Sequence, residues 1–147
     1  MNTEHLALLI DQKHAVLAQL LQLTVRQQPL AEADEIENFL SILTVKQQFL
    51  LALQQIERQL EPFRSQDPER RVWVSAEARE NVRRKASECE QLLHKVMQIE
   101  RQCESTLVHR RDAAAQSLQG LHAASRANVA YSKTETQSSR LDLTSES

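Results

Sequence analysis

Five histidines and two cysteines are the side chains that could bind a metal or act as nucleophiles. A di-iron site in a helical bundle needs a Glu three residues before a His. Three histidines have another residue there: Gln91 before His94, Thr106 before His109, and Gln119 before His122. The sequence also lacks a Gly-rich phosphate loop and a nucleophile elbow. We therefore expect no catalytic residue, no metal site and no cofactor.

The two cysteines indicate a reducing compartment. Cys89 and Cys103 are 14 residues apart in one predicted helix, so they would be separated by roughly 21 Å and could not form a disulfide. The longest apolar runs contain five residues, far fewer than the roughly 20 of a membrane-spanning helix. Glu4 and Asp11 flank the first run where a secretory signal would carry cations. We expect a cytoplasmic protein without membrane insertion.

Nucleic-acid binding is disfavoured by the charge pattern. The net charge is −2 over 147 residues. Basic clusters occur at 70–71, 83–85 and 110–111, but acidic residues interleave with them and the last two have no aromatic neighbours. We interpret these clusters as solvated helix faces.

Composition indicates an all-α fold. The chain has one Gly and three Pro, and only 3% of its residues are aromatic. Folds rich in β-structure or built to bind nucleotides need several glycines for tight turns and close approach to phosphate. The abundant Leu, Ala, Gln, Glu and Arg are strong helix formers. We therefore predict a single domain, residues 1–131, folded as an antiparallel up-and-down bundle with coiled-coil-like packing.

Apolar spacing and capping signals define three helices, at about 3–28, 34–61 and 76–131. Pro29 is predicted to end or kink the first helix, and Pro62 to end the second. Asp34 with Glu37 predicts a capping box, and Ser75 predicts the N-cap of the third helix. Gly120 could break that helix and begin a fourth.

The second helix carries two adjacent seams of side chains, so we predict that it contacts two neighbours. The first seam contains Ile36, Phe39, Leu43, Lys46, Leu50, Leu53 and Leu60. The second contains Ile42, Val45, Phe49, Ala52 and Ile56.

The connection and the tail differ in composition from the helices. In the loop 62–75, Asp67 and Pro68 could start a single helical turn. Trp73 either covers one end of the core or anchors a partner. Residues 132–147 hold eight Ser or Thr, so we predict a disordered polar tail.

Unequal helix lengths indicate a binding function. The first two helices would be roughly 40 Å long and an unbroken third helix roughly 84 Å. Its second half, about residues 108–131, would then project, fold back after Gly120, or pair with another chain. Such an unpartnered helix is typical of an adaptor or chaperone surface.

Several sequence features together resemble the FlgN-type flagellar export chaperones. A leucine-rich first helix ends in Thr24–Gln28, and an acidic start follows at Asp34-Glu35. The next features are Phe39-Leu40, Lys46 within a leucine run that continues through Leu50–Leu53, and a long Ala-rich helix ending in Ala130-Tyr131.

The resemblance implies a non-enzymatic bacterial chaperone. It would keep hook–filament junction subunits unassembled, using its C-terminal helical region, and deliver them to the flagellar export gate. Candidate contacts with substrate or gate are Leu118, Leu121, Val129 and Tyr131, although each could instead be a core residue. The alternative is a structural coiled-coil protein that homodimerises through its long C-terminal helix.

Overall fold

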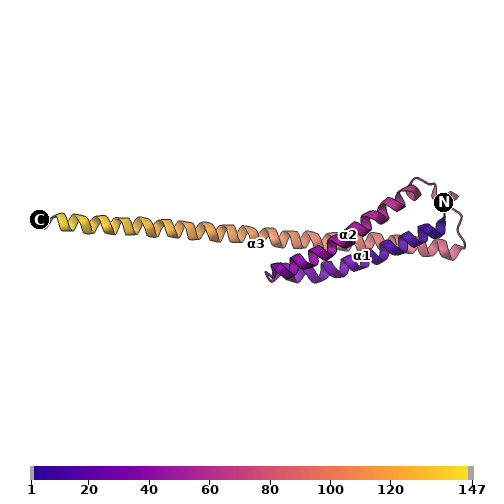
Figure 1. The fold of residues 1–147 in the computed structure, drawn as a ribbon, viewed down its shortest axis with the longest axis horizontal. Helices are drawn as coiled ribbons and strands as arrows, with labels where there is room; N and C mark the ends of the chain where they lie inside the picture. The colour runs from indigo at the N-terminus through magenta and orange to yellow at the C-terminus, as the bar shows by residue number, and fades with distance from the viewer. Residues whose placement is uncertain (1, 146–147) are drawn as a thin grey trace. The chain divides into compact units, whose positions relative to one another are not determined.

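The computed structural model describes the backbone of residues 2–145 and the side chains of residues 2–133, and it is all-α (Figure 1). The helices are α1 (Thr3–Glu32), α2 (Ile36–Arg64) and α3 (Ala76–Ser145), with a short 3-10 helix η1 (Pro68–Arg70) before α3. The described residues contain no strand. The predicted helical-bundle class is confirmed. The chain divides into two compact units, residues 1–106 and 107–147.

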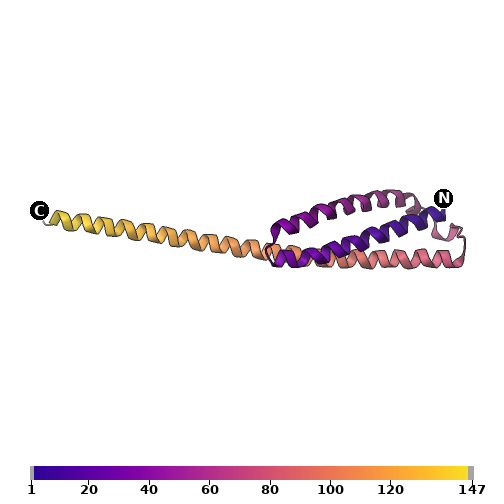
Figure 2. The same cartoon turned by 60° about the horizontal axis from the view of Figure 1, so that its bottom comes forward.

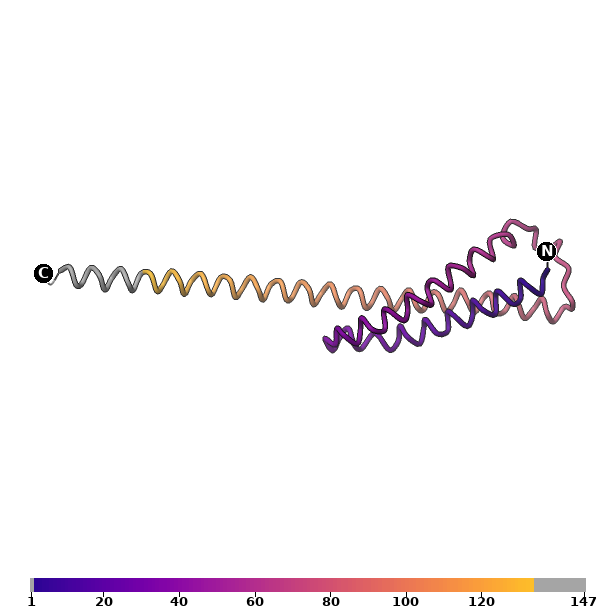
Figure 3. Tube along the Cα trace, viewed as in Figure 1, coloured from indigo at the N-terminus to yellow at the C-terminus, as the bar shows by residue number. Residues whose placement is uncertain are grey.

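The first unit is an up-down-up bundle. α1, α2 and the part of α3 up to residue 106 lie side by side with alternating direction (Figures 2 and 3). The short connection between Glu32 and Ile36 makes α1 and α2 antiparallel neighbours, and a longer connection that contains η1 leads back into α3.

Two apolar clusters form its core. In the first, Leu6, Leu9 and Ile10 of α1 pack with Ile56, Leu60 and Phe63 of α2. In the second, Leu17 and Leu20 of α1 pack with Cys89 and Val96 of α3. Trp73 is partly buried against the first cluster, which supports its interpretation as a residue that covers one end of the core.

The prediction that Pro62 ends the second helix was wrong, and Pro29 does not end the first. Pro29 lies inside α1, which continues to Glu32, and Pro62 lies inside α2, which continues to Arg64. The physical reason is position: within the last turn, a proline removes one backbone hydrogen bond without interrupting a long run. The Pro29 carbonyl still accepts a hydrogen bond from the Ala33 N–H at 2.9 Å.

Of the three predicted helix caps, two are formed and one is not. The Ser75 hydroxyl accepts from the Ala78 N–H at 3.0 Å, and the Asp67 carboxylate accepts from the Glu69 N–H at 3.1 Å. Both predictions are confirmed. The capping box at Asp34 is not formed, because the N-cap of α2 is Glu35 and makes no side-chain cap bond. Asp34 instead takes a φ of 61°, a left-handed conformation that Asp tolerates better than most residues.

α3 differs from its predicted form at two places. It runs unbroken through Gly120, so neither a fourth helix nor a fold-back at that glycine is formed. It also continues to Ser145, whereas residues 132–147 were predicted to be disordered; residues 146–147 lie outside the described residues. One glycine costs only about 1 kcal/mol in a helix, and after Gly120 neither Gly nor Pro interrupts the backbone hydrogen bonds.

Candidate partner-binding surface

A buried polar group ties the three helices of the first unit together. Lys46 is 3% exposed, and its ammonium group donates to the Gln27 side-chain oxygen of α1 at 2.8 Å and to the Glu100 carboxylate of α3. Gln27 in turn donates to the Phe39 carbonyl at 3.2 Å. Burial lowers the pKa of Lys46, although Cys103 nearby acts in the opposite direction. The arrangement fixes α1, α2 and α3 in one register.

Polar contacts between side chains along the bundle have the same effect. The Lys85 ammonium of α3 lies 2.6 Å from the Asp11 carboxylate of α1, and His14 Nε2 lies 2.8 Å from Glu88 Oε2. Between α1 and α2, Lys13 lies 2.7 Å from Glu57. These contacts hold the first unit together.

The described side chains hold no group of three or more His, Cys, Asp or Glu that could bind a metal. Cys89 and Cys103 are buried free thiols, and burial raises the pKa of each. No helix within residues 2–145 is both long enough and apolar enough to cross a membrane.

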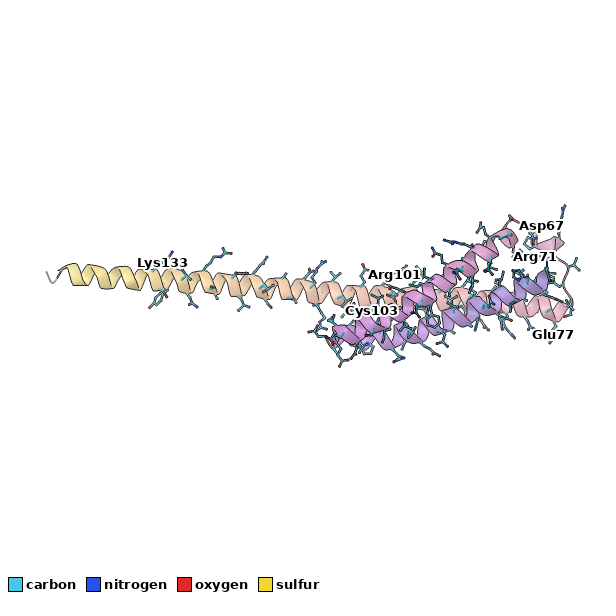
Figure 4. The ribbon with its side chains drawn as sticks, in the orientation of Figure 1. Asp67, Arg71, Glu77, Arg101, Cys103 and Lys133 are labelled. Carbon is cyan, nitrogen blue, oxygen red and sulfur yellow. The ribbon has the colours of Figure 1, made fainter. Side chains whose placement is uncertain are left out.

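The second unit presents the four predicted contact residues to solvent. Leu118, Leu121, Val129 and Tyr131 are 57%, 66%, 52% and 68% exposed. Every described side chain from residue 111 to residue 133 is exposed. Figure 4 shows the side chains of this segment spread around the helix as far as Lys133.

The unbroken helix divides these four residues between two faces. At about 100° per residue, Leu121 lies about 60° from Leu118 and Val129 about 20° from it, so the three form one stripe. Tyr131 lies about 140° from Leu118, on the other side of the helix. A single helical partner on the stripe would therefore not contact Tyr131.

Cationic side chains flank the stripe of Leu118, Leu121 and Val129. By the same helical geometry, Arg110 lies on one side of the stripe and Arg126 on the other, each about 80° from Leu118. Arg111, which is 3.4 Å from Asp112, lies close to the line of the stripe. A helix that carried acidic residues beside its apolar face would match this pattern in shape and charge.

Apolar residues on α2 form an exposed surface that the sequence analysis missed. Ile36, Leu43 and Leu50 were assigned to one seam with Lys46, but only Lys46 of these is buried; Leu43 is partly buried, and Ile36 and Leu50 are exposed. α1 and α3 cover only one side of α2. The sequence does contain a signal for this surface, because Leu40 and Leu51 belong to neither predicted seam. Both side chains are exposed in the structure.

Comparison of the chain with protein-family models, with curated proteins and with solved structures gives no match.

Proposed function

We propose that this protein is a non-enzymatic export chaperone of the FlgN-like kind. In this proposal it is cytoplasmic, holds hook–filament junction subunits of the bacterial flagellum unassembled, and delivers them to the flagellar export gate. The observation that carries the proposal is the exposed stripe of Leu118, Leu121 and Val129 on a helical segment in which residues 111–133 are all exposed.

Binding would proceed by pairing of helices. An amphipathic helix of the substrate lays its apolar face on the stripe, while Arg110 and Arg126 attract acidic residues beside that face. Burying each half-exposed apolar side chain would contribute about 1 kcal/mol, from which the costs of association are subtracted. A stripe of this size fits reversible binding, which a chaperone requires because it must release its cargo.

Titration calorimetry with purified protein and peptides from the helical termini of hook–filament junction subunits tests this proposal. Replacing Leu118 and Leu121 together by Ser should weaken binding about tenfold or more, since about 1.4 kcal/mol corresponds to a factor of ten. In the matched control, Leu8 and Val25, which are exposed side chains of α1, are replaced by Ser in the same way. This variant should bind the peptides with the affinity of the native protein. Equal affinity for the Leu118/Leu121 variant and the native protein would exclude this stripe as the substrate site.

The second candidate is a structural coiled-coil protein that homodimerises through α3. It is favoured by the opposite face of the same segment, where small residues alternate at four-three spacing up to Tyr131. The positions are Ala113, Ser117, Gly120, Ala124, Ala127 and Tyr131.

Sedimentation of the native protein and of a variant with Ala124 and Ala127 replaced by Glu separates the two candidates. The structural candidate requires a dimer that this variant lacks, because two introduced charges would be buried at the contact. The chaperone candidate requires peptide binding that the same variant retains, since these alanines lie off the leucine stripe.

A further inference from the structure

An outward-facing strip of α2 has the spacing of a coiled-coil seam. The strip consists of side chains that alternate at intervals of four and three residues: Ile36, Leu40, Leu43, Gln47, Leu50 and Gln54. Of its apolar members, Ile36, Leu40 and Leu50 are exposed and Leu43 is partly buried. Beside it, Leu51 is 61% exposed.

This outer α2 strip is distinct from the core-facing side of the helix. α2 buries Lys46, Ile56, Leu60 and Phe63 against the rest of the bundle, and none of these belongs to the strip. An open hollow of about 580 Å³ borders the strip. Its lining is mainly leucine and glutamine: Gln47, Leu50, Leu51, Leu53, Gln54 and Glu57. α2 thus has one face for the bundle and a second face with no partner among the described residues.

We propose that the outer α2 strip binds the same strip of a second copy of this chain, with the two α2 helices antiparallel. Antiparallel pairing stacks the seam in layers, of which one kind joins two leucines and two kinds join an apolar residue to a glutamine. Leu40 faces the partner's Leu50, Leu43 faces the partner's Gln47, and Ile36 faces the partner's Gln54. The contact is isologous, so each layer occurs twice.

Charge complementarity selects the antiparallel direction. Glu37 and Arg58 occupy equivalent positions on the solvent side of the seam, 21 residues apart, and within residues 2–133 neither forms an ion pair. Antiparallel pairing brings Glu37 of one copy next to the partner's Arg58, and the two-fold axis repeats this pair.

Parallel pairing lacks this match. It joins each position on the solvent side of one seam to the opposite flank of the other. That opposite flank contains Lys46 and Leu60, which are buried inside the bundle and so cannot contact a second copy. A parallel pair therefore gains no ion pair from Glu37 or Arg58.

The size of the strip sets the expected affinity. It covers 19 residues of one helix, roughly 28 Å in length, and two of its six members are glutamines. Stable interfaces bury about 800 Å² on each partner, and one half-exposed helix face of this length supplies less. We expect a reversible dimer with a dissociation constant on the order of micromolar.

Sedimentation equilibrium of the full chain between about 1 and 300 μM tests the proposal. The native protein should pass from monomer to dimer across this range. Glu37→Arg and Arg58→Glu should each weaken dimerisation about tenfold or more, because each places like charges together twice. The double variant should regain an affinity within a few-fold of the native value. Both side chains are exposed, and circular dichroism verifies that each variant is folded.

The control variant carries Glu at positions 124 and 127 and should dimerise like the native protein. This separates the proposal from the α3 homodimer, which that variant disrupts, and the variant with Ser at positions 118 and 121, which lacks the substrate stripe, should also dimerise like the native protein. A protein that stays monomeric throughout the range would overturn the proposal. So would a dimer unaffected by both single charge reversals, or one that the double reversal fails to restore.

Discussion

Lys46 of α2 and Gln27 of α1 form a buried hydrogen bond of 2.8 Å between the lysine ammonium and the amide oxygen. Glu100 of α3 binds the same ammonium group and is 45% exposed, so it also contacts solvent. A buried cation is stable only where such partners replace its hydration. The group therefore fixes where the helices meet, in addition to contributing energy.

Replacing Lys46 by Ala should lower the free energy of unfolding by about 2–4 kcal/mol, because the Gln27 oxygen loses its partner and a cavity remains. Urea unfolding followed by circular dichroism measures the change. The double variant Lys46→Met/Gln27→Leu should lie within about 1 kcal/mol of the native protein, since both polar partners are removed together. If the double variant were as unstable as Lys46→Ala, the loss would come from packing alone.

Glu57 should make stability depend on pH in the acid range. Burial alone would raise the pKa of Glu57, but hydrogen bonds and charges from Lys13 and Arg64 hold it below its ordinary value of 4.5. A carboxylate with a lowered pKa in the folded state stabilises the fold above 4.5, and this contribution disappears as the pH falls through the folded-state pKa.

The measurement compares urea unfolding of the native protein and Glu57→Gln at a series of pH values. The difference in unfolding free energy between them should be constant near neutral pH and should close as the pH falls below 4.5. Glu104→Gln, at an exposed position, serves as the control and should show no comparable change. A gap that stays open in acid would contradict the role given to Lys13 and Arg64.

The two thiols should be unreactive in the folded protein. Cys89 and Cys103 are buried, and burial raises the pKa of both, so access and the thiolate fraction are both reduced. Reaction with an aromatic disulfide reagent should be about tenfold or more slower than in denaturant. Two thiols that reacted equally fast in both conditions would show that the bundle around α3 opens readily.

Gly120→Ala should stabilise the distal part of α3. A Cβ added at Gly120 would meet nothing within 4 Å, and alanine is favoured over glycine in a helix by about 1 kcal/mol. Hydrogen exchange of the neighbouring amides should slow about fivefold. The reverse change, Ala124→Gly, should speed exchange by a similar factor. Faster exchange in Gly120→Ala would contradict a regular helix at this point.

The helices could be predicted from the sequence because four-three spacing and caps such as Ser75 are local signals. The helix ends at Pro29 and Pro62 could not, because the rule that proline stops a helix ignores how few hydrogen bonds remain in a last turn. Spacing also identifies which positions are apolar without saying which neighbour covers them. Ile36 and Leu50 were assigned to a seam that contacts a neighbouring helix for this reason, although both are exposed.

The candidate contact residues of α3 and the partners of Lys46 were likewise predictable only in part. Exposure of Leu118 and Leu121 agrees with a contact role, while the placement of Tyr131 on another face depends on whether the helix breaks at Gly120. The partners of Lys46 lie 19 residues before it and 54 residues after it. Nothing local to Lys46 indicates Gln27 or Glu100, because such contacts arise only when three helices meet.

The exposed run of α3 also links affinity to folding. From residue 111 to residue 133 no side chain is buried, so this run lacks the tertiary packing from which most helical stability in proteins comes. A ligand that requires it helical must supply the missing ordering free energy from its own contacts. The helix propensity of residues that do not contact the ligand would then change the affinity for the ligand.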